Sequence, residues 1–277
     1  MIRVFVDSGS SIKQEERERY GVEILPLKIL LDGEEYEDGI GLTNERFYQA
    51  LIEEKQFPKT SLPALDKVQE RVEACLAQGD EVLILSLSSG LSGTYSAIHM
   101  LFANEPRVRV VDTKTAVGGI RILVEEVNRR LQEPLGVVVE HIRALIPRIR
   151  IVAVPETLEY LHRGGRLSKS AYAIGQLLQI KPLIGFDDGH VCVLEKARGM
   201  KRAYQQIVGY LEACHCDPQY PIVPSYTYDP GNLRELIAYT PAPYRKQMTD
   251  FDNLDHAIAC HWGPNAFGYI FVAGETV

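Results

Sequence analysis

Short apolar runs alternate with amphipathic segments along the first 112 residues, and this alternation is the strongest constraint on the fold. The apolar runs predict strands buried on both faces, at residues 2–6, 24–30, 81–87 and 108–112. Apolar residues at helical spacing predict helices at residues 44–52, 65–75 and 93–102, the first with Thr43 as its N-cap. Because parallel strands need such crossover connections, this order predicts a largely parallel, covered sheet.

The pattern changes near residue 150. Strands are now expected in pairs, at residues 149–154, 182–186, 190–194 and 267–272, with a hairpin turn at Asp188-Gly189. Helices are expected at residues 156–162, 171–178 and 203–214. The sequence therefore predicts a two-domain α/β protein: an N-terminal, largely parallel α/β sheet domain (residues 1–148) and a C-terminal α+β domain (residues 149–277).

Composition excludes several classes of protein. The net charge is −7, from 30 Lys and Arg against 37 Asp and Glu, which argues against a general nucleic-acid binder. No apolar run approaches the roughly 18 to 20 residues that cross a bilayer, and the N-terminal run is too short for a signal peptide, so we expect no membrane insertion and a cytoplasmic protein. The five scattered cysteines are expected as reduced thiols. We predict no metal at Cys214-His215-Cys216, because no second ligand pair has zinc spacing.

Hydroxyl side chains gather after three predicted strands. The densest run spans residues 86–95, where a strand gives way to a helix; the others are residues 7–11 and the pair Thr60-Ser61 before Pro63. Strand ends and helix N-termini bind phosphate or carboxylate, and hydroxyls add donors. Helix capping alone is the alternative, because Ser and Thr favour helix starts regardless of function.

Two further groups of side chains carry possible chemistry. His261 lies where an apolar run meets a turn, so it is either a core histidine or a donor facing the hydroxyl loops. Arg166 and Arg198 stand in loops that could hold a phosphate or an acidic partner, with surface ion pairing as the alternative. Ser92, Asp112 and His261 also occur in the order nucleophile, acid, base along the chain, which is the order of a serine hydrolase. A serine hydrolase is therefore the alternative, enzymatic interpretation.

At these residues the chain resembles the DegV family of bacterial fatty-acid-binding proteins. Motifs spread over nearly the whole chain carry the resemblance, among them Lys59-Thr60-Ser61-Leu62-Pro63, residues 88–95, residues 156–167 and His261-Trp262-Gly263-Pro264. The resemblance implies a lipid-binding protein rather than an enzyme, with one long-chain fatty acid such as palmitate or oleate in an apolar tunnel and no cofactor. It also implies that the fatty-acid carboxylate is held by donors among Thr60, Ser61, Ser89, Ser92, Gly93 and His261.

The resemblance further implies a partner protein. Several such proteins present the acyl chain to a separate, dihydroxyacetone-kinase-like fatty acid kinase that makes an acyl phosphate. Arg166 and Arg198 would then face the phosphate or the kinase. This sequence departs from the family pattern at Leu62, usually Gln, at Thr113, usually Ser, and at Asn265, usually Gly; the segment at residues 119–148 is also shorter than usual.

The physical and family interpretations agree. Burying a carboxylate without donors costs several kcal/mol, so a polar cap is required. Each buried methylene contributes about 0.8 kcal/mol, so the tunnel would provide most of the affinity.

Overall fold

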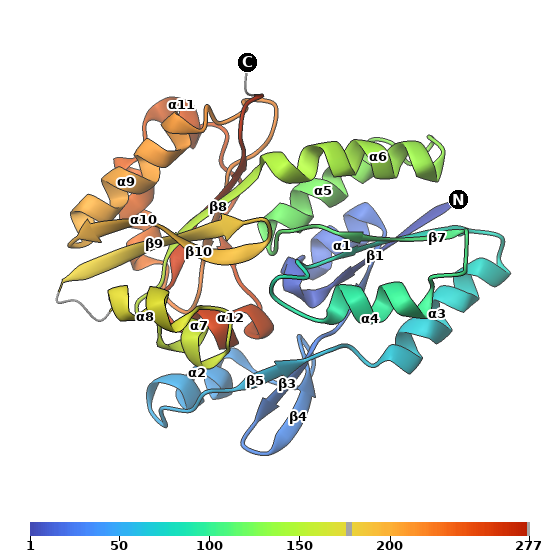
Figure 1. Ribbon diagram of the computed structural model, residues 1–277, viewed down its shortest axis with the longest axis horizontal. Helices are drawn as coiled ribbons and strands as arrows, with labels where there is room; N and C mark the ends of the chain where they lie inside the picture. Colours follow the sequence, from blue (N-terminus) through green and yellow to red (C-terminus); the bar gives the residue numbers. More distant parts are fainter. Residues whose placement is uncertain (176–178, 276–277) are drawn as a thin grey trace.

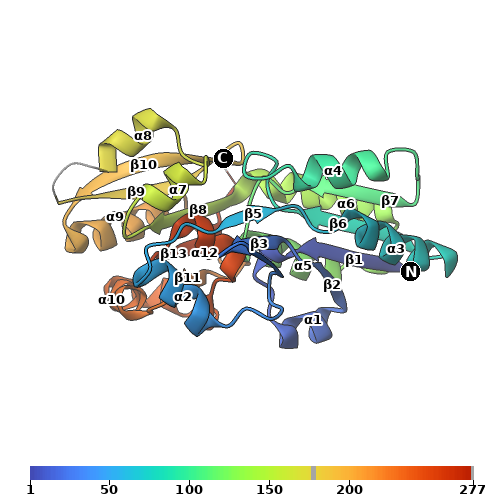
Figure 2. The same ribbon diagram turned by 90° about the horizontal axis from the view of Figure 1, so that it is seen from below.

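The computed structural model describes residues 1–175 and 179–275 (Figure 1). The strands in these residues form three β-sheets. Two large sheets lie side by side and a small sheet lies beneath them, with helices covering the outer faces (Figures 1 and 2). The chain is therefore the mixed α/β protein that the sequence predicts.

The N-terminal sheet is entirely parallel, as predicted. Its strands run in the order β2-β1-β6-β7 and comprise β2 (Val22–Leu25), β1 (Ile2–Asp7), β6 (Glu81–Ser86) and β7 (Val108–Asp112). Helices α3 (Leu65–Ala77) and α4 (Thr94–Leu101) cover one face of this sheet, where they pack with Phe5 and Ile84. The other helices of this half are α1 (Gln14–Tyr20), α5 (Gly118–Asn128) and α6 (Leu135–Leu145), with a 3₁₀ turn at Ser8–Ser10 and another at Ile146–Arg148.

The prediction of one strand over residues 24–30 is wrong. The segment splits into β2 and β3 (Lys28–Leu31), which belong to different sheets. Pro26 lies between them and has no N–H to continue a ladder. β3 instead forms a three-stranded antiparallel sheet with β4 (Glu34–Glu37) and β5 (Lys59–Ser61). Between β4 and β5 runs α2 (Asn44–Ile52), whose first turn is capped by Thr43 Oγ1, as predicted.

The C-terminal sheet has six strands in the order β10-β9-β8-β13-β11-β12. They are β10 (His190–Arg198), β9 (Ile180–Asp187), β8 (Ile149–Val154), β13 (Phe267–Val272), β11 (Val223–Tyr226) and β12 (Asp252–Asn253). All neighbours are antiparallel except β11 and β12. The hairpin predicted at Asp188-Gly189 is confirmed.

The helices of this half are α7 (Glu159–Arg163), α8 (Lys169–Gly175), α9 (Met200–Ala213), α10 (Gly231–Tyr239), α11 (Ala242–Arg245) and α12 (His256–Trp262). The helix predicted at residues 156–162 forms only as the short α7. Of the helix predicted at residues 171–178, residues 176–178 lie outside the described residues. No helix in the described ranges is long and apolar enough to cross a membrane.

The two halves share a core. One hydrophobic cluster joins Leu85 of β6 and Ile122 of α5 to Ile258 of α12 and Ile270 of β13. α12 also packs against β3 and β5, so a helix near the end of the chain closes over the small N-terminal sheet. The mixed sheet begins at Ile149, which is where the sequence puts the domain boundary; that boundary stays a prediction.

Candidate functional site

A cavity of about 280 Å³, here called the main cavity, opens where the two halves meet. β5 contributes Thr60 and Ser61, the loop from β6 to α4 contributes Ser92 and Gly93, and α12 contributes His261. Arg166 comes from the loop between α7 and α8. The remaining lining residues are apolar: Leu27, Leu62, Leu87, Leu91, Ala116, Leu161, Val191, Ala257, Ile258 and Trp262. A few polar groups thus face an otherwise apolar space, which is the usual composition of a small-molecule site.

Thr60 and His261 form the polar centre of this wall. Thr60 Oγ1 and His261 Nε2 lie 2.8 Å apart and share a hydrogen bond across 201 residues of sequence. Burial of the imidazole, with the nearby Arg166 cation, lowers the pKa of His261 to about 3, so the ring is neutral at pH 7. Its Nδ1 atom is buried and has no hydrogen-bond partner within the described part of the chain.

Ser92 and Gly93 lie beside this pair at the start of α4. Ser92 Oγ accepts a hydrogen bond from the Thr94 amide at 3.2 Å and lies 2.9 Å from the Thr94 hydroxyl. Gly93 is the N-cap residue and has no side chain to shield the backbone from the cavity. Thr60, in contrast, sits in strand β5, so its hydroxyl does not cap a helix.

Arg166 links the loop between α7 and α8 to the loop between β6 and α4 by hydrogen bonds. Its Nε donates to the carbonyl of Leu91 at 2.8 Å, and its Nη1 donates to the carbonyl of Gly164. Burial lowers the pKa of this guanidinium from its usual value. Among the described residues it forms no ion pair, so its charge is not neutralised by a carboxylate there.

A second cavity, here called the basic cavity, also borders His261. It encloses about 480 Å³ and shares Thr60, Arg166 and His261 with the main cavity. Lys59 and Arg163 add two further cations to its wall. The polar centre of the main cavity is therefore also the border of a more cationic space.

Two predicted site residues lie elsewhere, and so does Asp7 of the polar loop at residues 7–11. Ser89 is not part of the cavity wall, and its hydroxyl and amide both donate to the carboxylate of Asp112. Arg198 is exposed at the far end of β10, seven residues from the cavity-lining Val191, or about 23 Å along a strand. Asp7 is fully buried and holds the sheet edge by accepting from Ser86 Oγ and the amide of Leu87.

The hydrolase triad is not assembled. Asp112 engages Ser89 and Lys114 rather than His261. His261 Nε2 is taken by Thr60, and the described structure shows no hydrogen bond between His261 and Ser92. A serine nucleophile needs an adjacent base that a third group orients, so this arrangement does not support nucleophilic catalysis. Among the described residues, no cluster of three or more His, Cys, Asp or Glu side chains could hold a metal ion.

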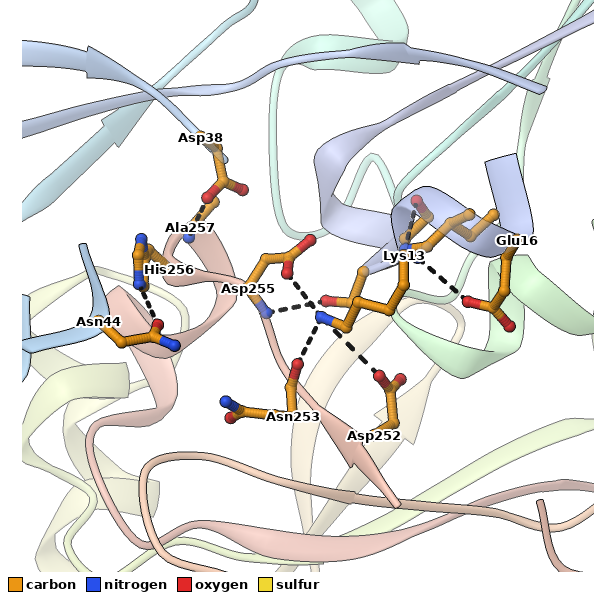
Figure 3. A network of polar contacts seen from close by, with 12 residues as sticks. Lys13, Glu16, Asp38, Asn44, Asp252, Asn253, Asp255, His256 and Ala257 are labelled. Atoms are coloured by element: carbon orange, nitrogen blue, oxygen red, sulfur yellow. Dashed lines mark hydrogen bonds and ion pairs between the residues drawn. The ribbon is translucent and has the colours of Figure 1, made fainter. Parts of the chain in front are cut away.

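A partly buried polar network holds the start of α12, the helix that carries His261 (Figure 3). Lys13 Nζ donates to Asp255 Oδ1 at 2.7 Å, and the Asp255 amide donates to Ser11 Oγ at 3.1 Å. Asp38 accepts from the Ala257 amide at 3.3 Å. Loss of these contacts would move α12, and with it the donors of the cavity wall.

Sequence reasoning did not find this network or α12 itself. A helix of seven residues that follows several polar residues gives little periodic signal. The apolar lining of the main cavity could also not be identified from the sequence. Its residues come from many separate segments, and each has the sequence pattern of an ordinary core residue.

Comparison with known proteins agrees with the fold. The model of a family described as "Uncharacterised protein, DegV family" matches residues 1–274. A DegV domain-containing protein of Caldanaerobacter subterraneus is 31% identical over 98% of both chains. A second, from Streptococcus pneumoniae, is 32% identical over 90% of this chain and 88% of its own.

Solved structures are similar along the whole chain. A fatty-acid-binding DegV family protein of Thermus thermophilus has a TM-score of 0.88 at 28% identity, covering 99% of each chain. One from Streptococcus agalactiae has a TM-score of 0.89 at 26% identity, again over 99% of each chain. A stearic-acid-binding protein of Eubacterium ventriosum has a TM-score of 0.85 at 25% identity, covering 99% of this chain and 98% of that one. From the family match and these relatives, the chain belongs to the DegV family.

Proposed function

We propose that this protein binds a long-chain fatty acid such as palmitate or oleate in the main cavity, with its carboxylate at Thr60, Ser61, Ser92, Gly93 and His261. The observation that carries the proposal is the Thr60–His261 hydrogen bond of 2.8 Å on the wall of an otherwise apolar cavity. The fatty acids bound by the similar proteins of Thermus thermophilus and Streptococcus agalactiae support it.

The protonation of His261 decides which donors the carboxylate finds. A proton on Nδ1 would be a buried donor without an acceptor in the described structure, and it would face the field of the Arg166 cation. The proton is therefore better placed on Nε2, from which it is donated to Thr60 Oγ1. The Thr60 hydroxyl is then free to donate to the carboxylate, and the neutral imidazole orients it.

The acyl chain supplies the affinity, and the donors supply the orientation. Each methylene that leaves water for the apolar wall contributes about 0.8 kcal/mol. The carboxylate contributes little net energy, because donors only offset the cost of removing a charge from water. Ser89 gains no support as a ligand, because Asp112 already accepts its hydroxyl proton.

The basic cavity supports a second part of the proposal, presentation of the carboxylate to a separate kinase. Lys59, Arg163 and Arg166 line this cavity together with Thr60 and His261, and Arg163 also forms an ion pair with Glu159. A new phosphate dianion there would meet cationic donors. The position of Arg198 gives no support for a role in holding that phosphate.

The first experiment extracts lipid from protein purified from a heterologous host and measures palmitate and oleate binding by titration. We expect a co-purified fatty acid and saturable binding; no lipid in the extract and no binding would refute the proposal. Thr60→Val and His261→Ala should weaken binding by about 5- to 150-fold, the equivalent of 1 to 3 kcal/mol for a lost donor. Ser96→Ala, on the exposed side of α4, is the matched control and should bind like the unmodified protein.

A second experiment separates a binder from a hydrolase. We expect no labelling of Ser92 by a fluorophosphonate and no ester turnover, since no base is positioned to activate it. Stoichiometric labelling that disappears in Ser92→Ala would overturn this. For the kinase, Arg166→Gln should reduce acyl-phosphate formation, with a cognate kinase and ATP, more than it reduces fatty-acid binding. An equal loss of acyl-phosphate formation and of fatty-acid binding would mean that Arg166 acts in ligand binding and not in phosphate transfer.

A further inference from the structure

A small, deep cavity adjoins the main cavity and is not explained by carboxylate binding. It encloses about 30 Å³ and shares Ala116 and Trp262 with the main cavity. Its floor is the face of the six-stranded sheet that looks toward α5. Ala116 and Trp262 thus form the border between the two spaces.

A row of small residues makes room along that floor. Ser225 of β11, Gly268 of β13 and Ala153 of β8 are direct partners in neighbouring strands. All three line the deep cavity. A Cβ on Gly268 would come within 2.2 Å of the carbonyl oxygen of Val152, so the backbone there accepts no larger residue.

Ser225 is the exception in this apolar space. The residue is only 4% exposed, and its Oγ has no hydrogen-bond partner among the residues that the structure describes. A buried hydroxyl without a partner is costly, and an alanine would fill the same position without that cost. The hydroxyl is therefore explained by a group that the protein chain itself does not provide.

The surroundings of Ser225 are polar beyond the cavity. Asp252 is its partner in the parallel β11–β12 pair, and Asp252 Oδ2 lies 3.9 Å from Arg121 Nη2, too far for a hydrogen bond. Within the described structure, Asp252 Oδ2 and Arg121 Nε and Nη2 also have no hydrogen-bond partner. Polar groups with unused hydrogen-bonding capacity therefore lie next to Ser225 in the fold, although they do not line the deep cavity.

We infer that the deep cavity receives the distal part of the acyl chain and that the Ser225 hydroxyl pairs with an oxygen substituent on it, so that the preferred ligands include hydroxy fatty acids. The inference rests on the proposed fatty-acid binding and adds the class of acyl chain. It makes Ser225 a residue that sets specificity, at the opposite end of the ligand from Thr60 and His261.

A single fixed water is the competing occupant. A space of this size holds about one water molecule, and such a water could satisfy Ser225 without any ligand. The two occupants differ in one respect: only a ligand oxygen makes the preference between acyl chains depend on Ser225.

The test compares matched pairs of ligands: palmitate with its terminal-hydroxy derivative, and stearate with mid-chain hydroxystearates. Dissociation constants are measured for the unmodified protein, Ser225→Ala, and the control Ser10→Ala, a buried serine outside both cavities. We expect Ser225→Ala to shift the preference in at least one pair by about tenfold toward the unsubstituted acid, and Ser10→Ala to leave every pair unchanged.

Ser225→Val tests the path of the chain separately, with thermal unfolding as the check on folding. By filling the deep cavity, it should weaken stearate binding more than laurate binding. If palmitate binds but Ser225→Ala shifts no pair by more than about twofold, a structural water only occupies the site and the inference is overturned. If no fatty acid binds to any variant, the proposed function itself fails.

Discussion

Replacing Gly164 by alanine tests whether the position of His261 controls ligand binding. Gly164 ends α7 with φ −70°, a conformation that alanine adopts without strain. A Cβ built there would lie 2.3 Å from His261 Nδ1 and 3.0 Å from the carbonyl oxygen of Tyr160. The backbone thus accepts the substitution, but the imidazole has to move.

The size of the effect follows from these distances. To restore ordinary contact near 3.4 Å, the ring must retreat by about 1 Å from its 2.3 Å approach. A displacement of that size is incompatible with the present geometry of the 2.8 Å Thr60–His261 hydrogen bond, because such bonds tolerate only a few tenths of an ångström of change. Losing the oriented donor should weaken fatty-acid binding by about 1 to 3 kcal/mol, or roughly 5- to 150-fold.

Global stability should change little in the same variant. Alanine at a compatible position stabilises by about 0.4 to 1 kcal/mol, which partly offsets the strained contact. The assay is therefore a pair of measurements, palmitate titration and thermal unfolding of delipidated protein. Wild-type affinity in Gly164→Ala would refute the reasoning, because it would show that the ring position does not matter.

The neighbouring glycine provides a matched control. Gly165 has φ +76°, and no heavy atom lies within 4 Å of a Cβ built on it. Gly165→Ala should therefore lower the free energy of unfolding by about 1 kcal/mol and leave palmitate affinity unchanged. The two variants thus separate a local loss of stability from displacement of His261.

Two other perturbations have expected outcomes. Burial raises the pKa of Asp38 to about 7, so the folded protein binds more protons than the unfolded chain between about pH 4 and 7, and ionisation of Asp38 costs stability as the pH rises through this window. Asp38→Asn should become progressively more stable relative to wild type over that window, by up to a few kcal/mol in denaturant titrations; a pH-independent difference would contradict this. Gly90→Ala would place a Cβ 2.5 Å from the carbonyl oxygen of Gly189 and disturb the 2.8 Å bond from Ser88 Oγ to that oxygen. We expect a loss of about 1 to 3 kcal/mol in unfolding experiments, whereas an unchanged melting temperature would mean that the loop yields freely.

The parts of the fold that were predictable are those with a local physical cause. Strands β1 and β6 are buried along most of both faces, so their sequences are nearly continuous apolar runs. The β9–β10 turn needs two residues with positive φ, and Asp188 and Gly189 supply 42° and 79°. Where the backbone geometry requires a particular residue type, as in this turn, the sequence predicts the structure.

The parts that were missed depend on contacts distant in sequence. Nothing local distinguishes β3 from a continuation of β2 except Pro26, and the choice of partner strand is made by β4 and β5. Likewise, no local signal separates the hydroxyl of Ser89 from that of Ser92. Asp112 on the next strand binds the first, while the second is left facing the cavity.

The pairing of Thr60 with His261 shows why the sequence could name residues of the candidate site without showing how they come together. Each residue stands in a recognisable motif, but the bond between them depends on α12 lying against β5. That position is set by Lys13, Asp38 and Asp255, which are polar residues that read as ordinary surface (Figure 3). These contacts within the protein hold the donors of the cavity wall in place, so a ligand would not have to supply the free energy of ordering them. Under the proposed function, pre-organisation of this kind matters most at the fatty-acid carboxylate, where donor energy and desolvation cost nearly cancel and a small displacement decides the sign.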